Sequence, residues 1–349
     1  MNENMVDNIR VRYLDIAKGI SLLLVMVSHS CRLPFGSKYF TSFYIQVFYI
    51  LSGISYKRGR TIGENIHKRF KGIIIPYFKY NFIIIAINII LGNLKTVEAL
   101  IKAIIGSIYS RYCLYPINYL GENRFFLQIG NSPMWFLTAI FLSSCMFYFI
   151  VERINGRKRL LYIYCIVLIM LTILLDQLPI LLPWSIDTAF LGTFFMLIGY
   201  YGKSAYMQEI RWKMLILILA VYIICCYCNE GINISIRIYG NYVGINVIFV
   251  CMIGMAGSLL CIYLSKKLEL VPVIRDIFEY IGKNTIIILS LHVTIFTIFD
   301  KILNWIGISE DINGVIYYGM GFIRLIVTVG VCYCISCVKK SWIKKPSIH

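Results

Sequence analysis

The fold is decided by stretches such as residues 243–265, VGINVIFVCMIGMAGSLLCIYLS, in which no side chain carries a charge. A helix rises about 1.5 Å per residue, so about 20 such residues cross the roughly 30 Å hydrocarbon core of a bilayer. Each stretch is expected to be helical, because lipid offers no partner to a free backbone N–H or C=O group. Ten such runs are predicted, the second and sixth of them short, at residues 13–31, 40–55, 72–92, 134–152, 159–176, 185–201, 213–229, 243–265, 284–303 and 315–337.

The composition agrees with this prediction and excludes several classes of protein. Of the 349 residues, 59% are apolar and 15% are charged, and the mean hydropathy is +0.75. A soluble domain has about 45–50% apolar and about 25% charged residues, and a disordered chain has fewer apolar ones. We therefore expect an all-α integral membrane protein with about 10 transmembrane helices. Residues 1–349 are expected to form a single membrane domain without a fused soluble domain.

The net charge of +17 is explained by where the basic residues lie. One alternate set of connections holds 23 Lys and Arg residues, the opposite set holds 8, and 3 lie within the runs. Because basic residues are retained on the inner side, both termini are predicted to be cytoplasmic in a multi-pass protein of the cell membrane. The basic clusters are expected to contact membrane lipids. Nucleic acid is not an expected partner, since it would need one continuous basic face.

The cysteines and one moderately apolar segment add two further expectations. The twelve cysteines include several that lie inside apolar runs, where a thiol behaves as a small hydrophobic group. They predict neither a disulfide scaffold nor a metal site. A moderately apolar segment, Val97–Tyr109, is expected to lie along the membrane interface.

The first run carries polar residues that are costly inside a bilayer and so need a reason. Arg12, Asp15, Lys18 and His29, together with two apolar residues between the last pair, follow helical spacings of three and four and share one face. From Lys18 to His29 is eleven residues, or about 17 Å along a helix axis. Histidine titrates near neutrality and can move a proton, which favours a functional role. The alternative is a headgroup pair between Asp15 and Lys18 and a structural hydrogen bond from His29.

A second group of charges precedes Pro76 and is strongly basic. Several cations close together at the start of a helix suit a polyanionic cytoplasmic ligand, such as a phosphate-bearing molecule. The alternative is an ordinary cytoplasmic loop that is retained by its charge. The residues of this group are Lys57, Arg58, Arg60, His67, Lys68, Arg69 and Lys71.

Three residues near the opposite side of the membrane form a third group. Trp135 and Trp184 each stand at the start of a predicted helix, and Asp187 follows shortly after the second. Tryptophan at this depth is typical of an interfacial anchor. Aromatic faces beside a carboxylate also suit a sugar. In the ninth run, Asn284 and His292 lie roughly on one side, where we favour an intramembrane hydrogen bond over catalysis for His292.

Several of these segments together resemble acyltransferase family 3, a family of membrane-bound enzymes. The opening segment RVRYLDIAKGI at residues 10–20, continued to His29, resembles that family's first helix. The segment from Pro183 to Tyr200 is similar to the fucose 4-O-acetylase-like branch. The other matching segments, in order, are Phe48–Gly53 with Ser52, the basic run through Arg69 to Pro76, Trp135–Leu137, and Gly282–Thr285 with Leu291 and His292.

The resemblance implies an enzyme that moves an acyl group, usually acetyl, from cytoplasmic acyl-CoA to a hydroxyl of a glycan or lipid-linked sugar. It implies that His29 is catalytic, either as a general base or as an acyl carrier, and that a basic pair contacts the donor. That pair corresponds to Lys68 and Lys71, lysines where arginines are common, with Arg69 between them. We expect Arg12 and Lys18 to help bind the CoA phosphates. Trp135, Trp184 and Asp187 are expected to position the acceptor, with Asp15, Ser52, Asn284 and His292 in support.

Two other functions remain open at this point. A transporter or flippase for a polar metabolite or glycan precursor would also place charges within helices. Against it, the sequence has no paired halves with interrupted helices, which usually mark a transporter site. The other alternative is a catalytically silent partner of polysaccharide-assembly proteins, which an intact His29 makes less attractive.

Overall fold

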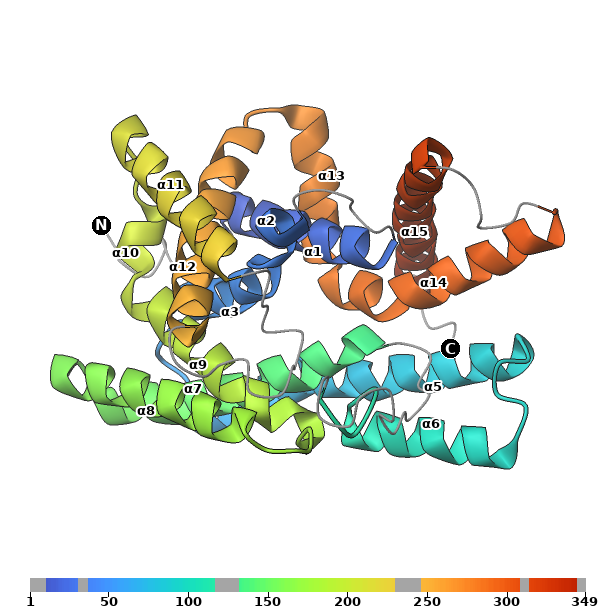
Figure 1. Cartoon of the computed structure of the whole chain (residues 1–349), viewed down its shortest axis with the longest axis horizontal. Helices are drawn as coiled ribbons and strands as arrows, with labels where there is room; N and C mark the ends of the chain where they lie inside the picture. The colour runs from blue at the N-terminus through green and yellow to red at the C-terminus, as the bar shows by residue number, and fades with distance from the viewer. Residues whose placement is uncertain (1–10, 31–36, 117–131, 230–245, 308–313, 344–349) are drawn as a thin grey trace, which may run out of the picture.

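The computed structural model describes residues 11–30, 37–116, 132–229, 246–307 and 314–343, and within these ranges it consists of helices and their connections, without a β-strand (Figure 1). The α-helices are α1 (Arg12–Ser30), α2 (Ser37–Thr41), α3 (Tyr44–Ile54), α4 (Ile62–Arg69), α5 (Ile75–Ile90), α6 (Val97–Tyr109), α7 (Trp135–Ile154), α8 (Lys158–Asp176), α9 (Ile186–Tyr201), α10 (Lys203–Met207), α11 (Trp212–Cys228), α12 (Asn246–Leu268), α13 (Pro272–Lys283), α14 (Thr285–Trp305) and α15 (Gly314–Ile343). The shorter elements are a π-helix, η2 (Phe70–Ile74), and two 3-10 turns, η3 (Ser132–Met134) and η4 (Pro183–Ser185).

The helices follow the predicted runs closely, and the all-α membrane architecture is confirmed. Each of the ten runs coincides with a helix, and the interfacial segment Val97–Tyr109 is α6. By length and composition, seven helices of the described chain can cross a membrane: α1, the continuous α4–η2–α5, α7, α8, α12, α14 and α15. The other three runs form the shorter helices α3, α9 and α11. The orientation of the termini stays a prediction, since residues 1–10 and 344–349 lie outside the described residues.

Two of these shorter helices are short because they lie inside the protein. Ten of the eleven residues of α3 are buried, and most of α9 is buried as well. The two helices cross at Gly53 and Gly199, where a Cβ on either glycine would overlap the backbone of the other helix. A helix buried by other helices does not need the length that lipid contact demands. Whether α3 and α9 cross the membrane stays a prediction from their apolar runs.

Helix α1 lies at the centre of the arrangement and contacts α3, α12, α13, α14 and α15 (Figure 1). Its closest neighbour is α13, which crosses it at Gly19 and Gly282. A Cβ at Gly19 would overlap the carbonyl oxygen of Phe278, and a Cβ at Gly282 would overlap that of Asp15. This contact explains physically why glycine stands in both segments, and it fixes the N-terminal end of α1 beside the start of α14.

Candidate active site

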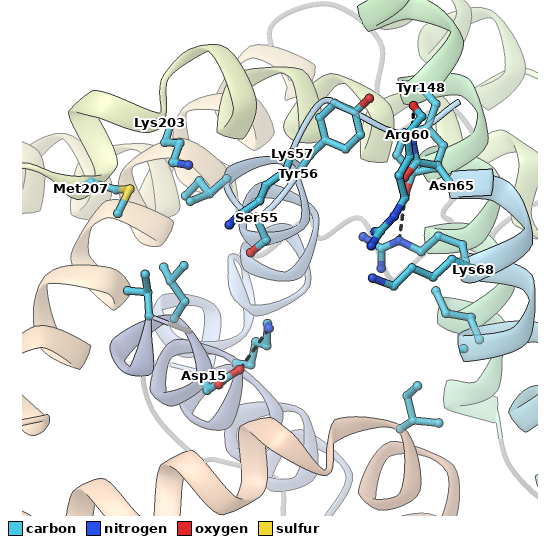
Figure 2. Close-up of a pocket in the computed structure, with 18 residues that line it drawn as sticks. Asp15, Ser55, Tyr56, Lys57, Arg60, Asn65, Lys68, Tyr148, Lys203 and Met207 are labelled. Atoms are coloured by element: carbon cyan, nitrogen blue, oxygen red, sulfur yellow. Dashed lines mark hydrogen bonds and ion pairs between the residues drawn. The ribbon is translucent and has the colours of Figure 1, made fainter. Parts of the chain in front are cut away.

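A cavity of about 670 Å³ opens at the N-terminal end of α1 (Figure 2). Its walls come from α1, the end of α3, the connection to α4, α4 with η2, α7, α10 and the start of α14. Of the described residues that line it, Asp15 is the one acid, and six are basic: Lys18, Lys57, Arg60, Lys68, Arg69 and Lys203. The cavity therefore suits a ligand with several negative charges.

The sequence around α4 explains how its basic residues reach this cavity. Gly59 takes a positive φ of 117° in the turn before the helix, a conformation that glycine adopts without strain. Thr61 and Glu64 then form a capping box that begins α4. About two turns later the chain widens into η2, because Pro76 has no N–H to bond with the carbonyl four residues before it. Arg69, next to this π-helix, donates a hydrogen bond from Nε to the Tyr148 hydroxyl, at 3.1 Å.

Two further residues shape the electrostatics of the cavity. Lys18 Nζ lies 3.2 Å from Asp15 Oδ1, so the nearly buried carboxylate is neutralised within its own helix. The remaining cations are then not offset by this acid. Burial raises the pKa of the Tyr56 hydroxyl, with a further contribution from neighbouring Tyr200. Tyr56 therefore stays neutral near pH 7, and its O–H can donate to an anionic ligand.

The predicted basic residues divide into two sets. Lys18, Lys68 and Arg69 line the cavity, whereas Arg12 and Lys71 do not. Arg12 Nε lies 3.4 Å from Glu279 Oε1 on α13, and this pair joins α13 to α1 instead. The π-helix changes the helical phase just after Arg69, and Lys71 is exposed outside the cavity. The adjacent pair Lys68 and Arg69, rather than the spaced pair Lys68 and Lys71, thus faces the cavity.

His29 lies in the last turn of α1, at the opposite end from the cavity. Its side chain is exposed, and the centroid of its ring lies 5.4 Å from that of His292 on α14. Leu22 and Val25, which separate Lys18 from His29 on the predicted face, are buried in the core. The cavity lining reaches Lys18 and Ile286 but does not include His29. A ligand that bridges both ends must pass beside this packed stretch of α1.

The residues predicted to position an acceptor are engaged with the protein itself. Asp187 is buried and pairs with Arg111. The guanidinium carbon of Arg111 lies 5.9 Å from the ring centroid of Trp135. Trp184 donates from its indole N–H to the carbonyl of Ile108 on α6, at 2.8 Å. The structure thus joins Asp187 and Trp135 through Arg111, and it uses the Asp187 carboxylate internally rather than offering it to a ligand.

The supporting residues are more dispersed than the sequence suggested. Asn284 caps the junction of α13 and α14, where its amide donates to the Tyr280 carbonyl at 2.8 Å. Ser52 is half-buried in α3, one residue before the Gly53 crossing. His292 is fully buried beside His29. Asn284 and Ser52 therefore serve the packing of helices, whereas Asp15 and His292 lie at the two ends of α1.

Sequence reasoning missed several charged residues near these ends. Lys203 follows directly after α9 and enters the cavity from α10, although in sequence it is only one of several basic residues in a connection. Arg111 lies in a polar connection, and nothing in its neighbourhood predicted its pair with Asp187. The sequence did single out Arg324, because a charged residue within an apolar run usually has a partner. It pairs with Asp300 and donates to the carbonyl of Ser30, at the end of α1.

Comparison with protein families identifies the chain. A family model described as an acyltransferase domain, that of acyltransferase family 3, matches residues 11–337. The chain belongs to acyltransferase family 3. Together with its apolar helices, this membership makes it a membrane acyltransferase. Searches of curated proteins and of solved structures gave no significant match. In the described part of this acyltransferase, no group of three or more His, Cys, Asp or Glu side chains is arranged to hold a metal ion.

Proposed function

We propose that this acyltransferase moves an acetyl or related acyl group from cytoplasmic acyl-CoA to a hydroxyl of a cell-surface or lipid-linked glycan. The observation that carries the proposal is the pairing of a cationic cavity and an accessible imidazole at the two ends of one helix. Acyl-CoA has the matching form, with phosphates at one end and a thioester at the end of a long flexible arm. Family membership supplies the reaction class.

The donor would bind with its phosphates among the six cations of the cavity. Arg60 and Arg69 offer planar groups that can hold a phosphate through two hydrogen bonds, and the lysines add point charges. Lys18, on α1 itself, marks the point from which the pantetheine arm would extend toward His29. The arm must cross about 17 Å beside Leu22 and Val25. Because both side chains are packed in the core, its binding requires α1 and the helices packed against it to separate locally.

His29 would then act on the acceptor hydroxyl in one of two ways. As a general base, an imidazole nitrogen takes the hydroxyl proton while the oxygen attacks the thioester carbonyl, and the departing thiolate recovers that proton as CoA thiol. As an acyl carrier, the nitrogen itself attacks the thioester carbonyl, and the C–S bond breaks to release CoA thiolate. The hydroxyl oxygen then takes the acyl group from the nitrogen, and the hydroxyl proton ends on the CoA thiolate. Both routes need a neutral, accessible imidazole. Trp135 and Trp184 would offer ring faces to the sugar, with Asp187 holding Arg111 beside Trp135.

The experiment uses membranes that contain the protein and matched membranes that lack it. Labelled acetyl-CoA is added, and label bound to glycan is measured together with the mass of the modified sugar. We expect label on glycan only when the protein is present. Its absence, with the protein folded and a suitable host glycan supplied, would contradict the proposal.

A thermal-stability measurement separates this function from transport of a polar metabolite. A ligand that binds the folded state raises the melting temperature by mass action. Coenzyme A should therefore stabilise the purified acyltransferase, and a flippase for an unrelated solute should not respond. A partner role in polysaccharide assembly would show neither stabilisation by coenzyme A nor transfer.

A further inference from the structure

The C-terminal end of α1 holds two histidines side by side. The ring of His29 lies 5.4 Å from that of His292, measured between centroids, with the planes tilted by 52°. The two residues differ in environment, because His29 is exposed and His292 is completely buried on α14. Phe296, one turn further along α14, packs edge-on against the His292 ring.

The hydrogen bonds of His292 determine which of its nitrogens carries hydrogen. Nδ1 lies 2.8 Å from the carbonyl oxygen of Leu289 and 3.2 Å from that of Ile288. A carbonyl oxygen only accepts, so Nδ1 must donate. The neutral ring then presents Nε2 as a pure acceptor. Nε2 is buried, and within the described chain no hydrogen-bond partner reaches it. A buried acceptor without a donor costs free energy of folding. A hydrogen bond to Nε2 from a ligand, or from a neighbouring side chain that rotates toward it, would remove this cost.

The backbone around His29 is held firmly by neighbouring helices. Ser30 donates from Oγ to the carbonyl of Gly321 on α15, at 2.8 Å. Arg324 donates to the carbonyl of Ser30, at 2.9 Å, and pairs with Asp300 of α14. On α3, the Tyr44 hydroxyl lies 3.4 Å from the Ser28 hydroxyl. These contacts hold Ser28 and Ser30 on either side of His29, whose own side chain is exposed.

Four helices that pack against α1 carry the charged and titratable groups considered for the pair: α15, α14, α3 and α2. These groups include Arg324 of α15 and Asp300 of α14, which are paired with each other, and Tyr44 of α3. Lys38 of α2 has its ammonium group 4.8 Å from the ring centroid of Tyr227. None of these described groups is bonded to His292 Nε2. The described neighbour with an exchangeable N–H, a free side chain and a ring contact to His292 is therefore His29.

We propose that His292 is a positioning residue for His29, whose N–H it accepts on Nε2 during the reaction. This inference rests on the proposed function. With one nitrogen of His29 held by His292, the other nitrogen keeps its lone pair and faces the reacting groups. A third group that orients a base in this way is a common requirement of acyl-transfer sites. No proton is consumed, because the N–H shared with His292 stays on His29 while the other nitrogen takes the hydroxyl proton and returns it to the CoA thiolate.

The test compares two variants of equal side-chain length, His292→Gln and His292→Met. Glutamine keeps an acceptor oxygen near the position of Nε2, whereas methionine fills a similar volume without a strong acceptor. We expect His292→Met to lose at least about tenfold in kcat with an unchanged KM for acetyl-CoA, and His292→Gln to recover most of that loss. The acid limb of the kcat profile should also move to lower pH in His292→Met, since the lost hydrogen bond favoured protonated His29.

The controls separate this inference from the proposed function. The control variant is Thr297→Val, about one and a half turns along α14 from His292. The Thr297 hydroxyl donates to the Val293 carbonyl of the same helix. Its loss should leave kcat and the pH profile of kcat unchanged. If wild type transfers label and His29→Ala does not, the proposed function stands. Equal kcat values and identical pH profiles for the Gln and Met variants would then overturn the role of His292 alone. Should His292→Met fail to fold, a wild-type pH profile in His292→Gln supports the proposal, and loss of transfer in that folded variant overturns it.

Discussion

At the scale of residues, the proposed donor site is a particular set of cations that line the cavity. Arg60, Lys68 and Lys203 face one space (Figure 2), and Arg69 lines it as well. Lys71 is not among the lining residues, although it is only three residues from Lys68. Sequence spacing could not make this distinction, because the π-helix that Pro76 accompanies changes the phase between Arg69 and Lys71. We therefore expect a cation to contribute to donor binding if its side chain lines the cavity, whatever its spacing in the sequence.

The first prediction concerns these cations. Arg60→Ala and Lys203→Ala should each raise the KM for acetyl-CoA about three- to tenfold, since a solvent-screened charge-assisted hydrogen bond to phosphate is lost. Steady-state rates at fixed ionic strength measure the effect. Lys71→Ala is the matched control and should keep the wild-type KM. A larger effect at Lys71 than at Arg60 and Lys203 would show that the donor does not use this cavity.

The second prediction concerns pH. His29 must be neutral to take a proton or attack a thioester, and an unperturbed imidazole has a pKa of about 6.5. Protonation increases as pH falls, so kcat/KM should decrease toward acid, approaching about tenfold per pH unit below the transition. The rate is measured between about pH 5 and 8. A profile without slope over this interval would argue against an imidazole that must lose its proton before it acts.

The sequence identified the two ends of α1 but not what connects them. Lys18 and His29 lie in one continuous helix, so their spacing puts them on one face as predicted. Lys18 also pairs with Asp15, as the alternative interpretation of these charges expected. The packing of Leu22 and Val25 in the core was not predictable, since an apolar residue on such a stripe can face either a ligand or a neighbouring helix. Asp187 shows the same limit. Its buried pair with Arg111 depends on a contact between residues 76 positions apart.

At the scale of elements, the crossing of α1 and α13 holds the cavity in place. Gly282 and Gly19 let the two backbones touch, and Asp15, which lines the cavity, contributes its carbonyl oxygen to this contact. The apolar runs predicted α1 but not α13, and nothing in the sequence indicated that the two helices cross at these glycines. The contact places the start of α14, with Ile286, against the cationic cavity.

The third prediction tests this crossing. Gly282→Ala should destabilise the protein by about 1–3 kcal/mol, because the new methyl group meets the backbone of α1 and the helices must separate. Thermal melting in detergent measures the loss. Gly63→Ala in α4, where a Cβ meets nothing within 4 Å, serves as control and should be neutral or slightly stabilising. Equal melting temperatures for the two variants would show that α1 and α13 do not pack at this distance.

At the scale of the whole molecule, the fold places a cationic cavity and a pair of histidines at opposite ends of one apolar helix, α1. The cationic cavity lies at the N-terminal end of α1 and the histidine pair at its C-terminal end. The distribution of Lys and Arg between connections predicts that the cavity end is cytoplasmic. Helix positions followed well from hydropathy, because lipid forces backbone groups into helices. The burial of α3 and α9 did not, since it depends on packing between helices that are distant in sequence.

The fourth prediction concerns sidedness. Sealed inside-out vesicles, which expose the cytoplasmic face, should transfer label from added acetyl-CoA to an enclosed glycan. Sealed right-side-out vesicles should transfer label only after permeabilisation, because acetyl-CoA does not cross the bilayer. A reporter fused after His349 should be accessible from the same face as the donor site. Transfer by sealed right-side-out vesicles alone would reverse the predicted orientation.

The central claim is that a donor bound at one end of α1 reacts at His29 on the other. It is tested most directly by His29→Ala, purified at the wild-type level and assayed for acetyl transfer from labelled acetyl-CoA. The account predicts that coenzyme A still raises the melting temperature of this variant as in wild type, because the cavity is intact, while transfer falls to background. Transfer at the wild-type rate by the folded variant would contradict the account.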